Sequence, residues 1–359
     1  MVAFSWNLST TCHRLPPVNY ETLRLVANHF LGTHHKRLRV PFQTQVTLNK
    51  TMKTNRTKPP DKARQSYFAC QWALARQNQS AAAQAAAELQ AETAKLAGYP
   101  IRVIVEDEAD LPDGPGVNLA WERGSAEHLV LCRREPVELQ PYELAAALVR
   151  IQTESEARRA GKSRVPSVSA RQKRELLFLF DREEAQRLAA EGGLWITLNR
   201  HPDDTALEPI RMLLASAPYM LVDARLRQRF PVLRPAQFLS RSTAFLEGCQ
   251  ARKGRTEIPA TQRLRERVIT ALDGLQGLYL DWLFGGVVSD FAARYHDLDG
   301  FDLARKLWQH WESRFAAMQP GDEFVLIDDF AGILGLAGRF GWVPGPSKVD
   351  GKGQETAKP

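Results

Sequence analysis

Hydrophobic and polar positions follow two different periods in the first half of the chain, and together they predict a helix, three strands and a second helix. An Ala-, Gln- and Glu-rich run predicts a long helix over 63–96, which Gly98 ends in the C-capping position. Short apolar runs bounded by turn residues predict strands at 101–105, 117–121 and 128–132. Pro141 suits the first turn of the next helix, which Gly161 closes.

Beyond Ser167 the apolar positions recur almost wholly at helical spacing. This pattern predicts helices at 170–191, 208–217, 224–230, 235–249, 261–293, 301–317 and 327–340. Gly274, Gly277, Gly285 and Gly286 are expected to break the fifth of these into two pieces. The fold class expected is therefore α+β, with an α-β-β-β-α unit followed by a mostly helical portion.

Composition divides the chain into four parts. Residues 1–62 are polar and basic, bury too little apolar surface to offset chain entropy, and are expected to form a disordered arm. The α/β unit is expected at 63–165 and the helical portion at 166–345. Residues 346–359 are expected to form a disordered tail.

The net charge of +7 is concentrated at one end of the chain. Residues 1–65 hold 11 Lys and Arg against Glu21 and Asp61, a net +9, so the remaining residues carry −2. A basic arm of this kind can neutralise phosphates, and a weak nucleic-acid contact through residues 1–65 is one expectation. The nearly neutral remainder does not favour a nucleic-acid-binding body.

Cysteine spacing and hydropathy indicate in which cellular compartment the protein is expected. The four cysteines are far apart and form no C-x-x-C pair, which favours reduced thiols over disulfides or a structural zinc site. No stretch reaches the ~18 apolar residues of a membrane span, and the start lacks the features of a signal peptide. A cytoplasmic protein without membrane contact is expected.

The candidate catalytic segment lies at the start of the second predicted helix, with the sequence Pro141-Tyr-Glu-Leu-Ala-Ala146. A zincin uses His-Glu-x-x-His because positions i and i+4 share one helix face, so two imidazoles meet one Zn²⁺ beside a water-activating Glu. Here Tyr142 and Ala146 stand at the two histidine positions and only Glu143 is kept. A phenol titrates near pH ~10, and a methyl group cannot bind a metal.

Two further segments resemble the same group of proteins. Glu156-Ala-Arg-Arg-Ala-Gly-Lys162 resembles the segment that follows the metal-binding helix in a family of bacterial zincin-like proteins. The proline-rich stretch over 217–238 is similar to a helix-opening segment of those proteins. The chain therefore resembles a degenerate gluzincin-type metallopeptidase over roughly 63–250.

This resemblance implies a zincin-like unit without zinc chemistry. Carried over by position, Glu143 falls where the family places its catalytic base, and Tyr142 and Ala146 fall at degenerate ligand positions. No metal or other cofactor is expected, and the old cleft is expected to bind a protein or peptide partner. Glu156, Arg158 and Arg159 are candidate cleft residues.

Helix geometry limits what Glu156 can do. It shares a helix face with Tyr142 and Ala146, but it lies about 15 Å along the axis from Ala146, too far to share a metal ion. Glu143 also has a structural interpretation, since a carboxylate near a helix N-terminus is favoured by the helix dipole.

Two alternatives to a non-catalytic binding protein stay open at this point. One is a nucleic-acid-associated protein that uses the basic arm. The other is a hydrolase that retains Glu143 with non-standard metal ligands. Cys132, beside Arg133 and Arg134, is a weaker candidate for a thiol with a lowered pKa.

Overall fold

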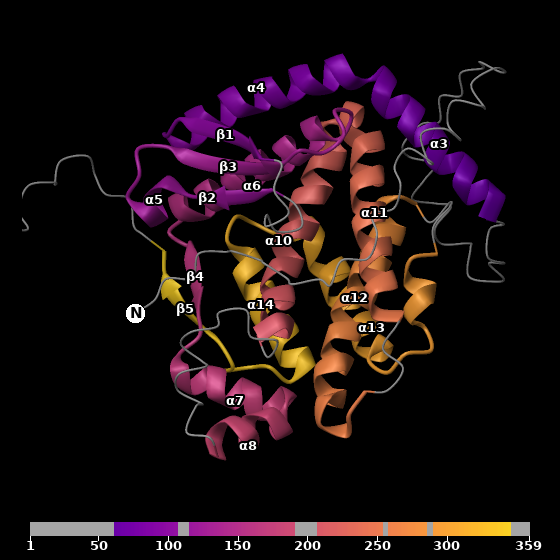
Figure 1. Ribbon diagram of the computed structural model, residues 1–359. Helices are drawn as coiled ribbons and strands as arrows, with labels where there is room; N and C mark the ends of the chain where they lie inside the picture. Colours follow the sequence, from indigo (N-terminus) through magenta and orange to yellow (C-terminus); the bar gives the residue numbers. More distant parts are fainter. Residues whose placement is uncertain (1–60, 107–114, 191–206, 254–257, 286–289, 346–359) are drawn as a thin grey trace, which may run out of the picture.

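The computed structural model describes residues 61–106, 115–190, 207–253, 258–285 and 290–345. Within these residues the chain is mainly helical and carries two small sheets, so the α+β class is confirmed (Figure 1). The predicted tail and residues 1–60 of the predicted arm lie outside the described part of the chain. No described helix combines the length and the apolar character needed to cross a membrane.

A three-stranded mixed sheet forms the first half of the fold. β1 (Ile101–Glu106) pairs in parallel with the central strand β3 (His128–Arg133), and β2 (Gly116–Asn118) pairs antiparallel with the other edge of β3. α4 (Gln79–Ala97) packs against α6 (Gln140–Arg159), and Figure 1 shows α4 crossing above β1. The three strands lie between α4 and α6, as the sequence predicts, but the short helix α5 separates β2 from β3.

Two local predictions in this half are wrong. The first helix is interrupted at Asn78, so that α3 (Asp61–Gln77) precedes α4. Trp121, expected at the end of the second strand, lies in the short helix α5 (Ala120–Arg123), where its ring meets the His128 ring edge-on at 4.6 Å. This aromatic contact and the left-handed Gly124 after α5 favour a turn of helix over a longer strand.

Among the described residues, α-helices form most of the second half: α7 (Ala170–Phe180), α8 (Arg182–Ala190), α10 (Glu208–Arg229), α11 (Arg234–Lys253), α12 (Arg263–Leu283), α13 (Phe301–Arg314) and α14 (Asp322–Leu334). α10 is central, since it packs against α6, α12 and α14. One continuous set of buried apolar side chains extends from α3 to the end of this half. α10 thus joins the helical portion to α6.

α10 is one helix where the sequence predicts two. Pro218 lies in its interior and lines a pocket, while Ala217 and Met220 beside it are buried. A proline removes one backbone hydrogen bond from a helix and usually costs about 3 kcal/mol. Burial of the turns on both sides of Pro218 offsets this cost. Helix propensities of single residues do not include such burial, so they predict a break here.

α12 also continues through glycines that were expected to break it. A Cβ added at Gly274 would lie 2.8 Å from Ala304 Cβ, and one at Gly277 would lie 3.0 Å from the backbone of Ala292. These glycines therefore permit close approach of α13 and of the short 3₁₀ helix Ala292–Tyr295. The helix ends at Leu283, and Gly285, two residues further on, adopts the left-handed conformation with a φ of 77°.

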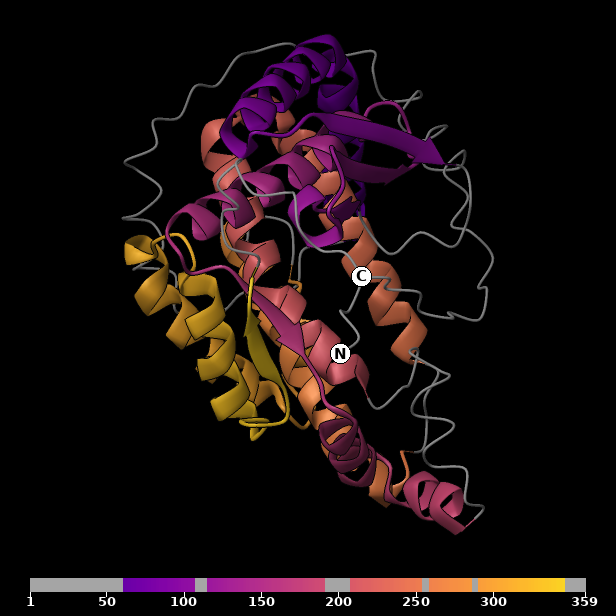
Figure 2. The same ribbon diagram turned by 90° about the vertical axis from the view of Figure 1, so that its left-hand side faces the viewer.

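The structure contains a second sheet that the sequence pattern does not predict. β4 (Arg164–Ser167), directly after α6, pairs antiparallel with β5 (Gly341–Pro344) near the end of the described chain. Figure 2 shows this pair beside α14. Both strands contain proline and are short, so neither has the alternating pattern that identifies a strand in the sequence.

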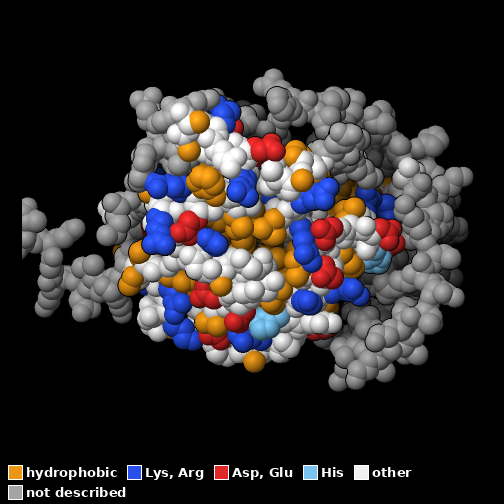
Figure 3. Space-filling view, turned by 90° about the horizontal axis from the view of Figure 1, so that it is seen from below, with side chains coloured by type: hydrophobic (Ala, Val, Ile, Leu, Met, Phe, Trp, Pro, Cys, Tyr) orange, Lys and Arg blue, Asp and Glu red, His pale blue; other side chains and the backbone are white. Residues whose placement is uncertain are grey.

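Charges of both signs are mixed on the surface. On the face seen in Figure 3, Lys and Arg side chains are interspersed with Asp and Glu, and hydrophobic side chains lie between them. This face does not carry one continuous basic patch, in line with the net charge of −2 outside residues 1–65.

Candidate functional site

The start of α6 places Tyr142 in the interior of the protein. Pro141 lies in the first turn of the helix, and Tyr142 is completely buried. Its hydroxyl donates a hydrogen bond of 2.7 Å to Oδ1 of Asp223 on α10. Burial, together with the nearby Asp223 and Glu143 carboxylates, raises the pKa of Tyr142 well above its usual value, so the phenol stays neutral.

Asp223 is the centre of a buried polar network. Its Oδ2 lies 2.8 Å from Nε of Arg241 on α11, and its backbone carbonyl accepts a hydrogen bond of 2.8 Å from Gln237 Nε2. The Arg241 guanidinium also lies over the rings of Tyr142 and Tyr219, at 5.9 and 5.2 Å from their centroids. Tyr142 is thus part of a buried, salt-bridged cluster between three helices.

Glu143 faces a different environment from its neighbour. Its Oε1 accepts a hydrogen bond of 2.5 Å from Ser240 Oγ on α11, and the residue lines a cavity. Burial raises the pKa of this carboxyl, while the positive charge of Arg241 opposes the shift. Glu143 is therefore a cavity-facing carboxyl with one neutral donor.

Ala146 is buried on the same helix, one turn after Tyr142, and borders a second, smaller pocket. Tyr142 and Ala146, which the sequence comparison places at the two histidine positions of a zincin motif, therefore lie with Glu143 at the start of α6. Their surroundings are apolar side chains and the Asp223–Arg241 pair.

The other predicted site residues lie at the opposite end of α6. Glu156 Oε2 is 2.8 Å from Arg225 Nη1, Arg158 lies over the Trp121 ring at 5.0 Å, and Arg159 contacts the carbonyl of Leu96. None of the three predicted residues lines either cavity. The structure does not bring Glu156, Arg158 or Arg159 together with Glu143.

The larger cavity has a volume of about 410 Å³ and lies between α6, α10, α11 and α12. Its walls combine apolar side chains with charges of both signs. The charged residues are Arg133, Glu135, Glu143, Glu208, Arg211, Asp223, Arg241, Glu247 and Asp273. Apolar surface with convergent polar groups is typical of ligand-binding cavities of this size.

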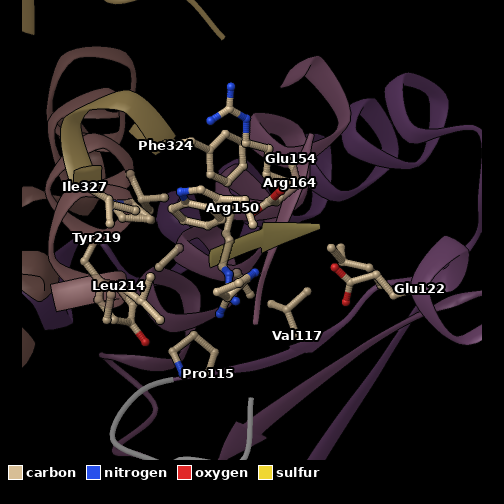
Figure 4. A pocket seen from close by; sticks show the side chains of 18 of the residues that line it. Pro115, Val117, Glu122, Arg150, Glu154, Arg164, Leu214, Tyr219, Phe324 and Ile327 are labelled. Atoms are coloured by element: carbon tan, nitrogen blue, oxygen red, sulfur yellow. The ribbon is translucent and has the colours of Figure 1, made fainter. Parts of the chain in front are cut away.

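The smaller pocket, of about 60 Å³, lies on the other side of Tyr219 and Arg241, which line both spaces together with Pro115 and Ala215. Figure 4 shows Tyr219, Leu214 and Ile327 on one side of it, Val117 and Glu122 on the other, and Arg150 between them. The two spaces are therefore neighbours that share a wall.

Cys132 lines the larger cavity, and it is not the thiol of lowered pKa for which its neighbouring arginines made it a weak candidate. Burial, reinforced by the negative charge of Glu143, raises the pKa of this thiol to about 12. The adjacent arginines in the sequence do not outweigh these effects.

Sequence reasoning missed Asp223, Ser240 and Arg241, which complete the site. One signal was present for Asp223, which lies within the apolar run Met220-Leu-Val-Asp-Ala224, where a charge that faces a core needs a counter-charge. Its contact with Tyr142 spans 81 residues, so no local spacing identifies it.

Comparison with known proteins gives no family: no family model, no curated protein and no solved structure matches the chain. Within the described ranges, no group of three or more His, Cys, Asp or Glu side chains is arranged to hold a metal ion.

Proposed function

We propose that this protein is a non-catalytic, metallopeptidase-like protein that binds a peptide segment of a partner in the cavity beside the start of α6. One observation carries the proposal. Tyr142, at the first ligand position, is fully buried and donates its hydroxyl to Asp223, while Glu143 next to it faces an open cavity. The helix that would hold a metal thus supports a binding cavity instead.

The cavity suits an extended peptide chemically. A peptide presents alternating amide groups and side chains, and the walls offer carboxylates, guanidiniums and apolar surfaces within one space. Hydrolysis by Glu143 would require a bound metal or another electrophile near its carboxyl to polarise the amide. The described side chains that act on Glu143 include Ser240, Arg241, Asp223 and Arg133, and Asp223 is paired with Arg241.

A substitution that fills the cavity tests this proposal. Gly248 on α11 lines the cavity, is exposed, and has open space where a Cβ would lie, so Gly248→Leu is expected to fold and to narrow the cavity. Peptides selected from a phage-displayed random library on the wild-type protein are expected to bind Gly248→Leu at least about tenfold more weakly. Fluorescence anisotropy with the labelled peptides measures this change.

Gly332→Leu is the matched control. Gly332 is an exposed glycine inside α14, also with open space at its Cβ position, and it lines neither cavity. Peptide affinity should therefore be unchanged in this variant. A library that yields no binding peptide, or selected peptides that bind Gly248→Leu as tightly as wild type, would overturn the proposal.

A further inference from the structure

The strand β1 forms one edge of the three-stranded sheet. Figure 1 shows it on the outer side of β3, and within the described part of the chain β3 is the strand that pairs with it. β1 has six residues and contains no proline, whereas the opposite edge strand, β2, has three residues and directly follows Pro115. Short strands and prolines protect a sheet edge from further pairing, so β1 is the less protected edge.

The hydrogen bonds to β3 define which backbone groups of β1 point outward. The N–H of His128 donates to the carbonyl of Pro100, and the N–H of Arg134 donates to the carbonyl of Glu106. In a parallel ladder, the residues whose backbone groups face the neighbouring strand alternate with residues whose groups face away from it. The even-numbered residues of β1 therefore face β3, and the odd-numbered residues face the outer edge.

The contact with α4 agrees with this orientation. Gln90 Nε2 donates a hydrogen bond of 3.1 Å to the carbonyl of Ile101, the first outward-facing residue. Ala83 and Ala87, on the same face of α4 as Gln90, are exposed. The edge is thus bordered by small side chains, which leave room for a second chain beside Val103 and Val105.

One apolar side chain at this edge is exposed. Ile101, Val103 and Val105 point to the same face of the sheet, where Ile101 and Val103 pack against the buried cluster that contains Val130 and Ile151. Val105 continues this apolar face but is 44% exposed. A strand added at the outer edge would place its own apolar side chains beside it.

The sequence of β1 is self-complementary in one antiparallel register. Outward-facing residues must pair with outward-facing residues, which is met when Ile104 of two copies lie opposite each other. Val103 then exchanges backbone hydrogen bonds with Val105 of the second copy, and Arg102 lies opposite Glu106 of the second copy. Both charged residues are exposed, and cross-strand pairs at such positions hold their side chains closest.

We infer that two copies of this chain pair through the outer edges of β1 and join their three-stranded sheets into one. The two-fold symmetry of this homodimer makes the contact between Arg102 and Glu106 occur twice. No residue of β1 lines the larger cavity, so the dimer is independent of the proposed peptide binding.

Sedimentation equilibrium of the full-length protein over a dilution series tests the inference. We expect a monomer–dimer equilibrium in wild type, with a dissociation constant at least about tenfold higher in Val105→Pro. The N–H of Val105 faces outward, so proline leaves the ladder to β3 intact and blocks only the added strand. Far-ultraviolet circular dichroism checks that the variant is folded.

Charge exchange tests the register itself and does not depend on the proline variant. Arg102→Glu or Glu106→Arg alone places like charges opposite each other twice, and each is expected to weaken the dimer at least about tenfold. The double variant, Arg102→Glu with Glu106→Arg, restores opposite charges and should dimerise as wild type does.

Glu127→Gln is the matched control. Glu127 lies 3.6 Å from Arg102 within one chain but is outside β1, so its neutralisation should leave the dimer intact. A monomeric wild type would overturn the inference. A dimer that Val105→Pro leaves unchanged, or one that the double charge exchange does not restore, would show that the copies meet elsewhere or in another register, and would equally overturn it.

Discussion

Asp223→Ala is expected to lower the free energy of unfolding by about 3–5 kcal/mol, because it leaves the Arg241 guanidinium and the Tyr142 hydroxyl without their acidic partner in the interior. Removing one member of a buried ion pair costs more than the pair itself contributes, since the remaining charge stays desolvated. Urea denaturation followed by circular dichroism measures the loss.

Tyr142→Phe is the matched control for this prediction. It removes one hydrogen bond but keeps the ring in place and leaves Asp223 paired with Arg241. The expected loss is about 1 kcal/mol. If Asp223→Ala cost no more than Tyr142→Phe, the buried cluster would not hold the start of α6 as described.

Glu154→Gln is expected to stabilise the protein above neutral pH by up to about 3 kcal/mol. The pKa of Glu154 is raised by burial from 4.5 to about 7, so between these values the folded state binds more protons than the unfolded state. Stability from this group is therefore present at acid pH and falls as pH rises from 4.5 to 7. Glutamine keeps the shape without the charge and removes this loss.

Denaturation of the wild-type protein and of Glu154→Gln at pH 5 and pH 8 isolates the contribution of the Glu154 carboxyl to stability, because the two proteins share all other titrating groups. Glu156→Gln on the same helix is the control. Its carboxylate pairs with Arg225 at 2.8 Å, so its removal should bring no gain at pH 8. A stability difference between wild type and Glu154→Gln that does not grow from pH 5 to pH 8 would contradict the assignment.

Local sequence signals predicted the first half of the fold well. β1, β3 and the proline-opened α6 follow from apolar runs, turn residues and Pro141, and Gly98 caps α4 with a φ of 76° as expected. These features depend on backbone preferences of neighbouring residues, which a sequence displays directly.

The errors occur where tertiary contacts override local preference. Pro218, Gly274 and Gly277 are helix breakers in isolation, yet each lies inside a helix that other helices enclose. β4 and β5 pair across more than half of the described chain. Neither kind of contact can be read from residue spacing.

The role of the candidate site residues stays a prediction. Glu143, Tyr142 and Ala146 were identified from a motif; in the structure Glu143 lines the larger cavity, Ala146 lines the smaller pocket, and Tyr142 is buried against Asp223. Tyr142 contacts Asp223, which pairs with Arg241; these two residues come from two other helices and have no motif of their own. The relationship to zincins stays a prediction, because it was made from short segments and no comparison tests it.

Zinc content after equilibration tests the central claim most directly. Purified full-length protein is incubated with excess Zn²⁺, desalted, and measured by elemental analysis alongside Glu143→Gln. Because Tyr142 is engaged by Asp223 and Ala146 offers no donor, the account predicts far less than one retained zinc ion per chain in both proteins. One zinc ion per wild-type chain, lost in Glu143→Gln, would contradict it.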